Sequence, residues 1–599
     1  MLKIEYLAET HFVRISLDGL QTSIWNEVRK VCEENSEELR ITSSSSIEIP
    51  WWSFLSCAKS IDLVGRRYKV ILQLDELTKK MLKHAQKNRQ KFKLSKETLP
   101  IDKELIAQKL ISTNFKRPLT SQQLRNVAKL YSLSGGATFS VPGAGKTTEA
   151  LALFTLKKKV NSKLLIVAPK NAFPAWEEQV IECLTNPPNI VRLRGGEKNI
   201  QVLLEQDPEI SLITYQQFPN VINTIAKHYT KNDFFLILDE SHRIKRGNSG
   251  VIGKSILNIS HLPSEKLIMS GTPMPNSPED LVSQFNFLYP EVKIDKDTVL
   301  HEIQSIYVRT TKNELDIPKY TMRYVEVEMS ASQRKIYDLL KSETLRQLEA
   351  LEMPDKYKLR SLGKSVMKLL QATSNPALLL KNDENFSEDL KSLIMQGDSS
   401  KLDYVINRTR ELVKDKKKVL IWSSFTDNIE ILNSRLKDLG ADYIHGGVDS
   451  GFEEDIDTRE YKIKNFHENE NSMVLIANPA AASEGISLHT ICHNAIYMDR
   501  NYNAAQFLQS VDRIHRLGLS KEIKTLIEIV TCANSIDDSV NRRLTQKIEN
   551  MAMVLNDQSI VVEPEYSDEE ISSNVAEEVI LENLNMKDVE DLMQQLRGQ

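Results

Sequence analysis

Short, unbroken runs of apolar residues recur along the chain, and they predict buried β-strands. Four of them precede residue 300: Leu164–Ala168, Ser211–Tyr215, Phe234–Leu238 and Lys266–Ser270. Runs without polar alternation are typical of strands that are covered on both faces of a parallel sheet. Stretches of helical length separate the runs. The pattern therefore predicts a doubly wound parallel sheet.

A second set of apolar runs begins after residue 417 and predicts a second α/β lobe. Between the two sets the pattern becomes helical, over Ser332–Ala350 and Tyr357–Ala372. The fold class predicted is therefore α/β, with two tandem doubly wound lobes and helical insertions. The runs of the second set are Lys418–Ser424, Ala441–Gly447, Ser472–Asn478, Asn494–Asp499 and Thr525–Val530.

The first 115 residues predict a separate, small α+β domain. Alternating residues at the start indicate strands, and Thr22–Glu38 indicates a helix. A second helix, Asp75–Phe92, is strongly basic, so it is either an arm that follows nucleic-acid phosphates or a solvated surface. Trp51 and Trp52 either stack on bases or pack the core of this domain, and we favour packing.

Composition limits the classes of protein that remain. The chain has 599 residues, a net charge of -4 and 41% hydrophobic residues, as expected of a globular protein of several domains. Its five cysteines have no metal-type spacing, which argues against zinc. No apolar run has the length of a membrane span or a signal peptide. We therefore expect a soluble cytoplasmic protein, of a prokaryotic or viral kind, with the nucleus as the alternative compartment.

Residues 137–150, with the sequence ATFSVPGAGKTTEA, predict a phosphate-binding P-loop. An apolar lead-in, a glycine-rich turn and a helix-forming run supply the strand, loop and helix N-terminus that such a loop needs. Ser140 replaces the first glycine of the usual pattern. The residues expected to bind the nucleotide are Gly143, Ala144, Gly145, Lys146, Thr147 and Thr148, with the Thr147 hydroxyl also expected to ligate Mg²⁺.

Two carboxylates, Asp239 and Glu240, follow the apolar run Phe234–Leu238. The carboxyl end of a strand in an open α/β sheet opens into the crevice where ligands bind. We expect Asp239 to hold Mg²⁺, and Glu240 to orient and deprotonate the attacking water. Together with the P-loop, these residues predict an NTP hydrolase.

Two further groups of polar residues complete the predicted site. Gln122 and Gln123 precede the P-loop in a segment opened by a proline, and an amide can both donate to and accept from adenine. Arg513 and Arg516 are expected on one helix, where a spacing of three places them on the same face. They are either surface ion-pairing residues or arginine fingers for the γ-phosphate, and we favour the second role.

The order of these motifs resembles that of the Swi/Snf-type ATPases, within the helicase-like superfamily two. Asp239–Arg246 (DESHRIKR) resembles the family's DEAH-type signature, and Ser270–Pro290 resembles its TGTP motif. The segment Ile306–Leu340 resembles the junction into the helical insertions. Ala482–Leu488 and Gln509–Gly518 resemble the last two motifs. The similarity covers residues from about 117 to 550.

The resemblance implies a fold, a site and an activity. The two lobes would be RecA-like, Gln123 rather than Gln122 would read adenine, and ATP with Mg²⁺ would be the cofactors. The loops after Pro169, around Tyr215 and Thr272, and around Ser423–Phe425 would contact the nucleic-acid backbone. Ser241, Ser487 and Leu519 depart from the usual family residues and affect substrate preference more than ATP chemistry.

The expected function is an ATP-dependent translocase on double-stranded DNA, or a remodeller of protein–DNA complexes. The alternatives are a strand-separating DNA or RNA helicase, and an ATP-switched DNA-binding subunit of a larger defence or repair assembly. A protein partner would dock on the N-terminal domain or on the acidic tail, which we otherwise expect to be disordered. The expected domains are 1–115 (accessory), 116–295 (ATP-binding lobe), 296–400 (linker and helical insertion), 401–550 (C-terminal lobe) and 551–599 (acidic tail).

Overall fold

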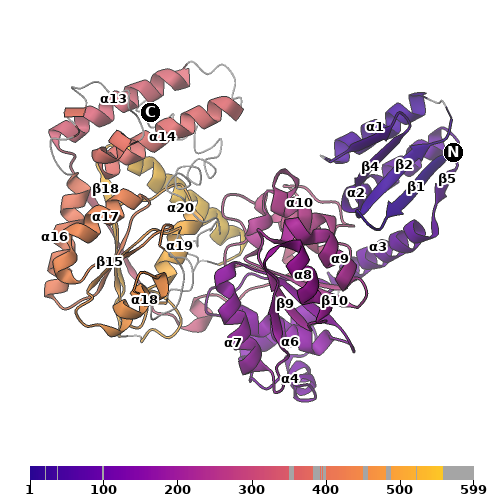
Figure 1. Cartoon of the computed structure of the whole chain (residues 1–599), viewed down its shortest axis with the longest axis horizontal. Coiled ribbons are helices and arrows are strands. Elements are labelled where there is room, and N and C mark those ends of the chain that lie inside the picture. The colour runs from indigo at the N-terminus through magenta and orange to yellow at the C-terminus, as the bar shows by residue number, and fades with distance from the viewer. Residues whose placement is uncertain are drawn as a thin grey trace. The chain divides into compact units, whose positions relative to one another are not determined.

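The computed structural model divides the chain by its internal contacts into two units, Met1–Glu314 and Leu315–Gln599. Each unit is described by itself (Figure 1). The structure describes residues 1–19, 22–36, 38–96, 100–349, 356–381, 391–392, 394, 399–448, 456–480, 487–520 and 522–557. The predicted acidic tail beyond Asp557 therefore lies outside the described residues.

The N-terminal domain consists of a five-stranded mixed sheet with α1 and α2 beside it (Figure 1). Its strands stand in the order β3-β4-β2-β1-β5, with β1 antiparallel to β2 and parallel to β5. This architecture is the predicted α+β domain. Its elements are β1 (Leu2–Leu7), β2 (Phe12–Leu17), α1 (Thr22–Asn35), β3 (Arg40–Ser43), β4 (Ser46–Pro50), α2 (Trp51–Arg67), β5 (Leu72–Leu74) and α3 (Glu76–Ser95).

The first tryptophan of α2 packs the core of this domain, as we favoured from the sequence. Trp51 is 1% exposed and stands edge-on to Tyr6, with 5.2 Å between the ring centroids. The Tyr6 hydroxyl also hydrogen-bonds the Nε2 atom of His261, which belongs to the following lobe, at 2.7 Å. Trp52 is only half-buried. The N-terminal domain is thus joined to the first lobe through buried aromatic and histidine side chains.

The first lobe is built on a seven-stranded sheet in the order β12-β6-β11-β10-β7-β9-β8. All of its neighbouring strands run parallel. The four predicted apolar runs of this region form β7, β9, β10 and β11, so the doubly wound sheet is confirmed. The strands are β6 (Gly135–Thr138), β7 (Lys163–Val167), β8 (Ile190–Arg192), β9 (Ile210–Ile213), β10 (Phe234–Asp239), β11 (Glu265–Met269) and β12 (Tyr307–Val308).

Amphipathic helices connect these strands and cover the sheet. The phosphate-loop helix α6 is buried along most of its length, from Thr148 to Thr155. The helices are α4 (Lys103–Ile111), α5 (Ser121–Tyr131), α6 (Lys146–Lys157), α7 (Phe173–Cys183), α8 (Gly196–Glu205), α9 (Ile222–Tyr229), α10 (Val251–Asn258), α11 (Asp280–Leu288) and α12 (Val299–Gln304).

The second unit contains a six-stranded sheet in the order β13-β18-β17-β14-β16-β15, again with parallel neighbours. The five predicted runs form β14 to β18, and β13 joins them at one edge. Two tandem RecA-like α/β lobes are thus present. The strands are β13 (Thr321–Val327), β14 (Val419–Trp422), β15 (Asp442–Ile444), β16 (Val474–Ala477), β17 (Asn494–Tyr497) and β18 (Leu526–Cys532).

A pair of long helices, α13 (Ala331–Glu349) and α14 (Lys356–Ser374), is inserted between β13 and β14, as the sequence predicts. The core of the lobe is formed by strand residues such as Val419 and Ile496, which are 0% exposed. The remaining helices are α16 (Ser400–Lys414), α17 (Thr426–Arg435), α18 (Arg459–Glu468), α19 (Ala504–Asp512) and α20 (Ile536–Val554).

Within the part of the chain that the structure describes, no helix combines the length and apolar character needed to cross a membrane. All five cysteines are buried free thiols.

Candidate functional site

β6 leads into the predicted phosphate-binding loop, and α6 leads out of it. Gly143 and Gly145 both have φ of 85°, in the left-handed region that favours glycine. Gly145 is the N-cap of α6, which begins at Lys146. The free N–H groups of the first helical turn and the helix dipole favour an anion at this point. The strand, loop and helix expected from the sequence are therefore all in place.

The polar side chains at the start of α6 take different directions. The Lys146 ammonium donates a hydrogen bond to the Ser140 carbonyl, 2.9 Å away, across the loop. The Thr148 hydroxyl is buried and donates to Gln179 Oε1 at 2.8 Å. Thr147 is only half-buried. Thr147 is thus the better placed of the two threonines to meet a metal ion outside the protein core.

Gln123 lies against the phosphate-binding loop. Its amide nitrogen donates to the Ala144 carbonyl at 3.1 Å, and its amide oxygen accepts from the Thr120 N–H in a capping box. A Cβ atom built on Gly145 would come within 2.2 Å of the Gln123 amide nitrogen and displace that side chain, and the φ of 85° at this position favours glycine as well. Gln122 instead donates to the Glu314 carbonyl. The geometry therefore favours Gln123 over Gln122 at the nucleotide.

Asp239 ends β10 and is held by two buried aromatic residues. The Trp176 indole N–H donates to Asp239 Oδ2 at 2.9 Å, and the Tyr215 hydroxyl donates to the Asp239 carbonyl at 2.7 Å. Both aromatic side chains are at most 1% exposed. The Glu240 N–H donates to the other carboxylate oxygen at 3.1 Å. The carboxylate is therefore fixed before any ligand binds.

Glu240 adopts a left-handed backbone conformation, with φ of 53°, where the strand ends. The Ser270 hydroxyl lies 3.4 Å from its Oε2 atom and 3.0 Å from His242 Nδ1. The Thr272 N–H also donates to the Ser270 hydroxyl. The TGTP-like segment after β11 is thus connected to the predicted catalytic carboxylate through one serine.

Burial and mutual repulsion govern the charges at this site. Burial raises the pKa of Asp239, and burial together with the Asp239 charge raises the pKa of Glu240. The Lys146 ammonium opposes both shifts, which places all three charged groups in one electrostatic neighbourhood. Burial lowers the pKa of His242 far below its usual range, so this imidazole is neutral.

The residues present fit a nucleotide-bound Mg²⁺ ion. No cluster of three or more His, Cys, Asp or Glu side chains suited to a metal occurs among the described residues. Mg²⁺ differs from metals held in protein cages, because it is usually bound by one or two carboxylates together with substrate phosphates. Asp239 supplies an oriented carboxylate, and Thr147 supplies the hydroxyl beside the loop.

Behind the loop lies a buried polar network that the sequence motifs do not reveal. The Asn126 amide of α5 donates to Glu149 Oε1 at 2.8 Å and to the Thr310 hydroxyl at 2.9 Å. Thr138 of β6 contacts the other oxygen of Glu149 at 3.1 Å. Burial raises the pKa of Glu149 to about 7. The network connects the glutamine helix, the strand before the loop and the helix after it.

In the second unit, the loop Ser423–Phe425 is held by Asp499 at the end of β17. One carboxylate oxygen accepts hydrogen bonds from the hydroxyls of Ser423 and Ser374, both at 2.7 Å. The other accepts from the Ser424 N–H at 2.6 Å. Sequence reasoning did not find Asp499 because its partners lie far from it in the chain.

The expectation of one helix carrying Arg513 and Arg516 is wrong. α19 ends at Asp512, and Arg513 is its C-cap. The chain then turns, and the N–H groups of Ile514 and His515 both donate to the Val511 carbonyl, at 3.2 and 3.1 Å. The Arg513 carbonyl is taken by the Leu488 N–H at 2.8 Å, a contact outside the helix. In the motif Ala482–Leu488, which resembles another family motif, residues 482–486 lie outside the described residues.

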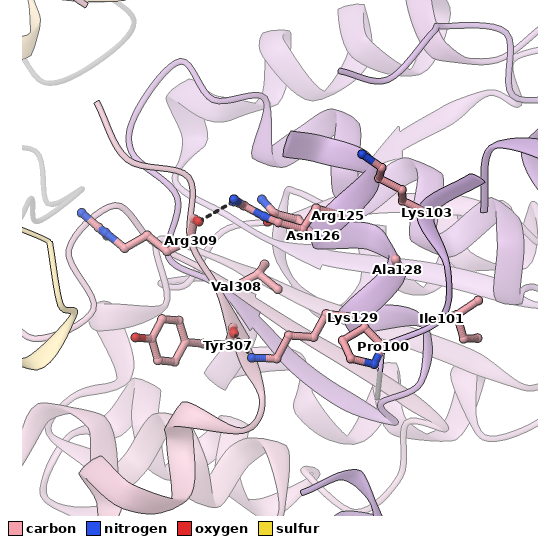
Figure 2. A pocket seen from close by; sticks show the side chains of 10 residues that line it. All are labelled: Pro100, Ile101, Lys103, Arg125, Asn126, Ala128, Lys129, Tyr307, Val308 and Arg309. Atoms are coloured by element: carbon pink, nitrogen blue, oxygen red, sulfur yellow. Dashed lines mark hydrogen bonds between the residues drawn. The ribbon is translucent and has the colours of Figure 1, made fainter. Parts of the chain in front are cut away.

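A separate basic cavity of about 470 Å³ opens beside α5 and the edge strand β12 (Figure 2). Lys129 reaches across it and donates to the Tyr307 carbonyl at 2.8 Å, and Arg125 donates to the Arg309 carbonyl at 2.8 Å. None of the predicted nucleotide or metal ligands lines it. The lining residues are Pro100, Ile101, Lys103, Arg125, Asn126, Ala128, Lys129, Tyr307, Val308 and Arg309.

Two family models match the chain. The SNF2-related domain matches residues 76–299, and the helicase conserved C-terminal domain matches residues 400–518. Together they cover more than half of the chain and follow the expected order. The first match begins at α3, earlier than residue 117, where the expected similarity starts.

Curated relatives carry names of the same kind. An ATP-dependent helicase of Mycoplasma genitalium is 25% identical over 511 residues, which cover 82% of this chain and 46% of the relative. An ATP-dependent helicase of Schizosaccharomyces pombe is 23% identical, covering 77% and 41%. The ISWI chromatin-remodeling complex ATPase ISW2 of Saccharomyces cerevisiae is 23% identical, covering 69% and 38%. The chain spans less than half the length of these relatives.

A solved structure, the Sulfolobus solfataricus SWI2/SNF2 ATPase core in complex with dsDNA, covers 78% of this chain and 98% of its own, with 19% identity and a TM-score of 0.31. The family assignment is carried by the two domain matches and by the motifs that they contain. The chain belongs to the SNF2-type ATPases of helicase superfamily two.

Proposed function

We propose that this chain is an ATP hydrolase that moves along double-stranded DNA and remodels protein–DNA complexes. The observation that carries the proposal is the meeting of Lys146, Asp239 and Glu240 at the carboxyl ends of β6 and β10. Phosphoryl transfer to water requires a cation for the phosphates, a carboxylate for the metal ion and a base for the water. Lys146, Asp239 and Glu240 would fill these three roles.

Each residue has a defined part in this mechanism. Lys146 leaves the Ser140 carbonyl and binds the β- and γ-phosphates, while Gln123 contacts the adenine. Asp239 and Thr147 would hold Mg²⁺, which when bound neutralises the charge on the phosphates. Glu240 accepts a proton from the attacking water at its carboxylate.

The raised pKa of Glu240 suits this task, because a base works best when its pKa is close to the working pH. Ser270 hydrogen-bonds Glu240, so the loop after β11 can sense whether the γ-phosphate is present. Arg513 and Arg516 of the second lobe would complete the site as arginine fingers when the two lobes close on ATP. Closure and reopening during each cycle would move the two lobes along the DNA backbone in turn.

A translocase is favoured over a strand-separating helicase by the helical pair α13 and α14, which is inserted between β13 and β14 of the second lobe, because plain helicases need no insertion at this point. Contacts to the DNA backbone would make the activity indifferent to base sequence. The proposed protein partner of the N-terminal domain, and an ATP-switched role in a larger assembly, remain secondary hypotheses.

The test is ATP hydrolysis measured with duplex DNA, single-stranded DNA and RNA of equal length. Duplex DNA should stimulate turnover most, and a triplex-forming strand should be displaced while a forked duplex stays paired. Lys146→Ala serves as the inactive control, since it removes the cation that binds the phosphates. Efficient opening of the fork would assign the chain to the helicases, and turnover unaffected by Lys146→Ala would refute the ATP site.

A further inference from the structure

Helix α3 carries a concentrated positive charge on an otherwise slightly acidic chain. The chain has 78 basic and 82 acidic residues, yet Glu76 is the only acidic residue within α3. Lys79 forms an ion pair with Glu76 at 2.6 Å. The exposed basic residues of the helix are Lys79, Lys80, Lys83, Lys87, Arg89, Lys91 and Lys93.

Four of these lysines form a continuous stripe along one side of the helix. Lys80, Lys83, Lys87 and Lys91 follow one another at intervals of three or four residues, which places them on one face. No ion pair with a carboxylate within 4.0 Å occurs for any of the four among the described residues. Like charges at a spacing of four residues destabilise a helix by about 0.2–0.5 kcal/mol per pair. Repulsion among these lysines therefore destabilises the helix, and a bound polyanion would offset that repulsion.

The opposite side of α3 fixes the helix at both ends. Near its start, the Tyr6 N–H of β1 donates to the Thr78 hydroxyl at 2.7 Å. Near its end, the buried Phe92 packs on Tyr289 and Phe285 of the first lobe, with centroid distances of 4.6 and 5.5 Å. Ala85 is buried between these two points. The lysine stripe is thus presented outward by a helix that is held to both the N-terminal domain and the ATP-binding lobe.

We propose that the stripe Lys80–Lys83–Lys87–Lys91 binds the phosphate backbone of duplex DNA, outside the helicase motifs. At about 1.5 Å per residue the stripe is roughly 16 Å long. A single strand of duplex DNA presents one phosphate about every 3.4 Å along the axis, so about five phosphates face that length. Four positive charges thus lie along a length that about five phosphates occupy, and the contact is indifferent to base sequence because it meets only phosphates.

This inference rests on the proposed function, because the stripe would be a second contact with the same duplex DNA. A contact on α3 leaves the ATP site unaltered. It should therefore change how tightly DNA binds and leave the turnover at saturating DNA unchanged. The stripe would keep the first lobe bound to the DNA during the part of the ATPase cycle in which the interlobe cleft is open.

The experiment compares three variants of the full chain. The first replaces all four stripe lysines with glutamine, which keeps a good helix former while removing the charge. The second replaces them with arginine, which keeps the charge. The third makes the same change in net charge at exposed lysines elsewhere in the first unit: Lys30→Gln, Lys59→Gln, Lys198→Gln and Lys227→Gln.

Affinity for a duplex is measured by fluorescence anisotropy at several salt concentrations. Each phosphate contact contributes about 0.9 to the slope of log K against log salt, so the glutamine variant should lose between roughly three and four from that slope. The arginine variant and the scattered control should keep the wild-type slope. The DNA concentration for half-maximal ATPase stimulation should rise in the glutamine variant only, with the maximal rate retained.

The possible outcomes separate the two proposals. An unchanged slope in the glutamine variant, or an equal loss in the scattered control, overturns the α3 contact while duplex-stimulated ATPase still supports the proposed function. Absence of duplex stimulation in the wild-type chain overturns the proposed function instead. A loss confined to single-stranded DNA or RNA overturns the assignment of the stripe to duplex DNA. Melting curves of all variants should match that of the wild type, and the arginine variant controls for any change of helix packing.

Discussion

Trp176→Phe should weaken Mg²⁺ binding while leaving the maximal rate of ATP hydrolysis close to that of the wild type. The substitution keeps an aromatic ring in the buried site of Trp176 but removes the N–H that donates to Asp239 Oδ2 at 2.9 Å. That hydrogen bond favours the ionised carboxylate, against the burial that raises its pKa. Without it, Asp239 is both less anionic and less well oriented.

The magnitude follows from the kind of hydrogen bond that is lost. A hydrogen bond to a charged group contributes about 1.5–3 kcal/mol, or roughly a factor of 10–150. Removing a group that orients a metal ligand typically costs about 10–100-fold in metal affinity. The Mg²⁺ concentration for half-maximal binding of ATP should therefore rise by about tenfold or more. The rate at saturating Mg²⁺ should change much less, because Glu240 and Lys146 are unaltered.

The assay titrates Mg²⁺ at a fixed concentration of fluorescent nucleotide and records binding and turnover separately. Trp422→Phe is the matched control, because Trp422 is also 1% exposed and its indole N–H has no hydrogen-bond partner among the described residues. A half-point that is unchanged in Trp176→Phe, or shifted equally in Trp422→Phe, would refute the orienting role of Trp176.

Four other substitutions test the remaining parts of the site. Glu240→Gln should bind ATP and Mg²⁺ but not hydrolyse ATP, whereas Asp239→Asn should lose Mg²⁺-dependent binding; equal binding defects in nucleotide titrations would contradict this division. Arg516→Ala should reduce duplex-stimulated turnover by about 10³–10⁵-fold if it acts as an arginine finger, with unchanged ATP affinity and melting temperature; normal turnover would argue for a surface role. Burial raises the pKa of Glu149 from 4.5 to about 7, so the folded state favours the neutral acid. The free energy of unfolding should therefore fall by about 3 kcal/mol in all as the pH rises from 4.5 through 7. Glu149→Gln stays neutral and should flatten that loss in melting curves at pH 5 and pH 8, and parallel curves for the two proteins would show that Glu149 is not the cause.

The strands at the centre of each lobe could be predicted from the sequence because burial on both faces leaves an unmistakable pattern. Phe234–Leu238 is apolar throughout, and it forms most of β10. β13 has the opposite character, since its residues alternate between exposed and half-buried positions at the edge of its sheet. Four of its seven residues are exposed, so no continuous apolar run marks it. Edge strands of this kind depend on pairing with a neighbour, here β18, which lies far along the chain.

The candidate site is also predictable only in part, because some of its groups are neighbours in the sequence and others are not. Local chemistry identifies the P-loop, because glycines, a lysine and a helix start stand together in the sequence. The groups that orient it do not stand together. Trp176 reaches Asp239 across 63 positions, and Asn126 reaches Thr310 across 184. Only the fold brings such pairs into contact, because each joins a helix residue, Trp176 of α7 or Asn126 of α5, to a residue at or just beyond the end of a strand.

The end of α19 shows why a spacing rule fails at the boundary of an element. A spacing of three places two side chains on one face only while the backbone remains helical. The residues between Gln509 and Arg516 include no helix breaker, so the sequence predicts that the helix continues through both arginines. The end of the helix coincides with two tertiary contacts, in which the Arg513 carbonyl accepts from the Leu488 N–H and the His515 ring contacts the Pro318 carbonyl. Arg513 therefore lies at the C-terminus of α19, and Arg516 lies in the turn beyond it. Their roles toward a nucleotide are two separate hypotheses, and evidence for one arginine does not carry over to the other.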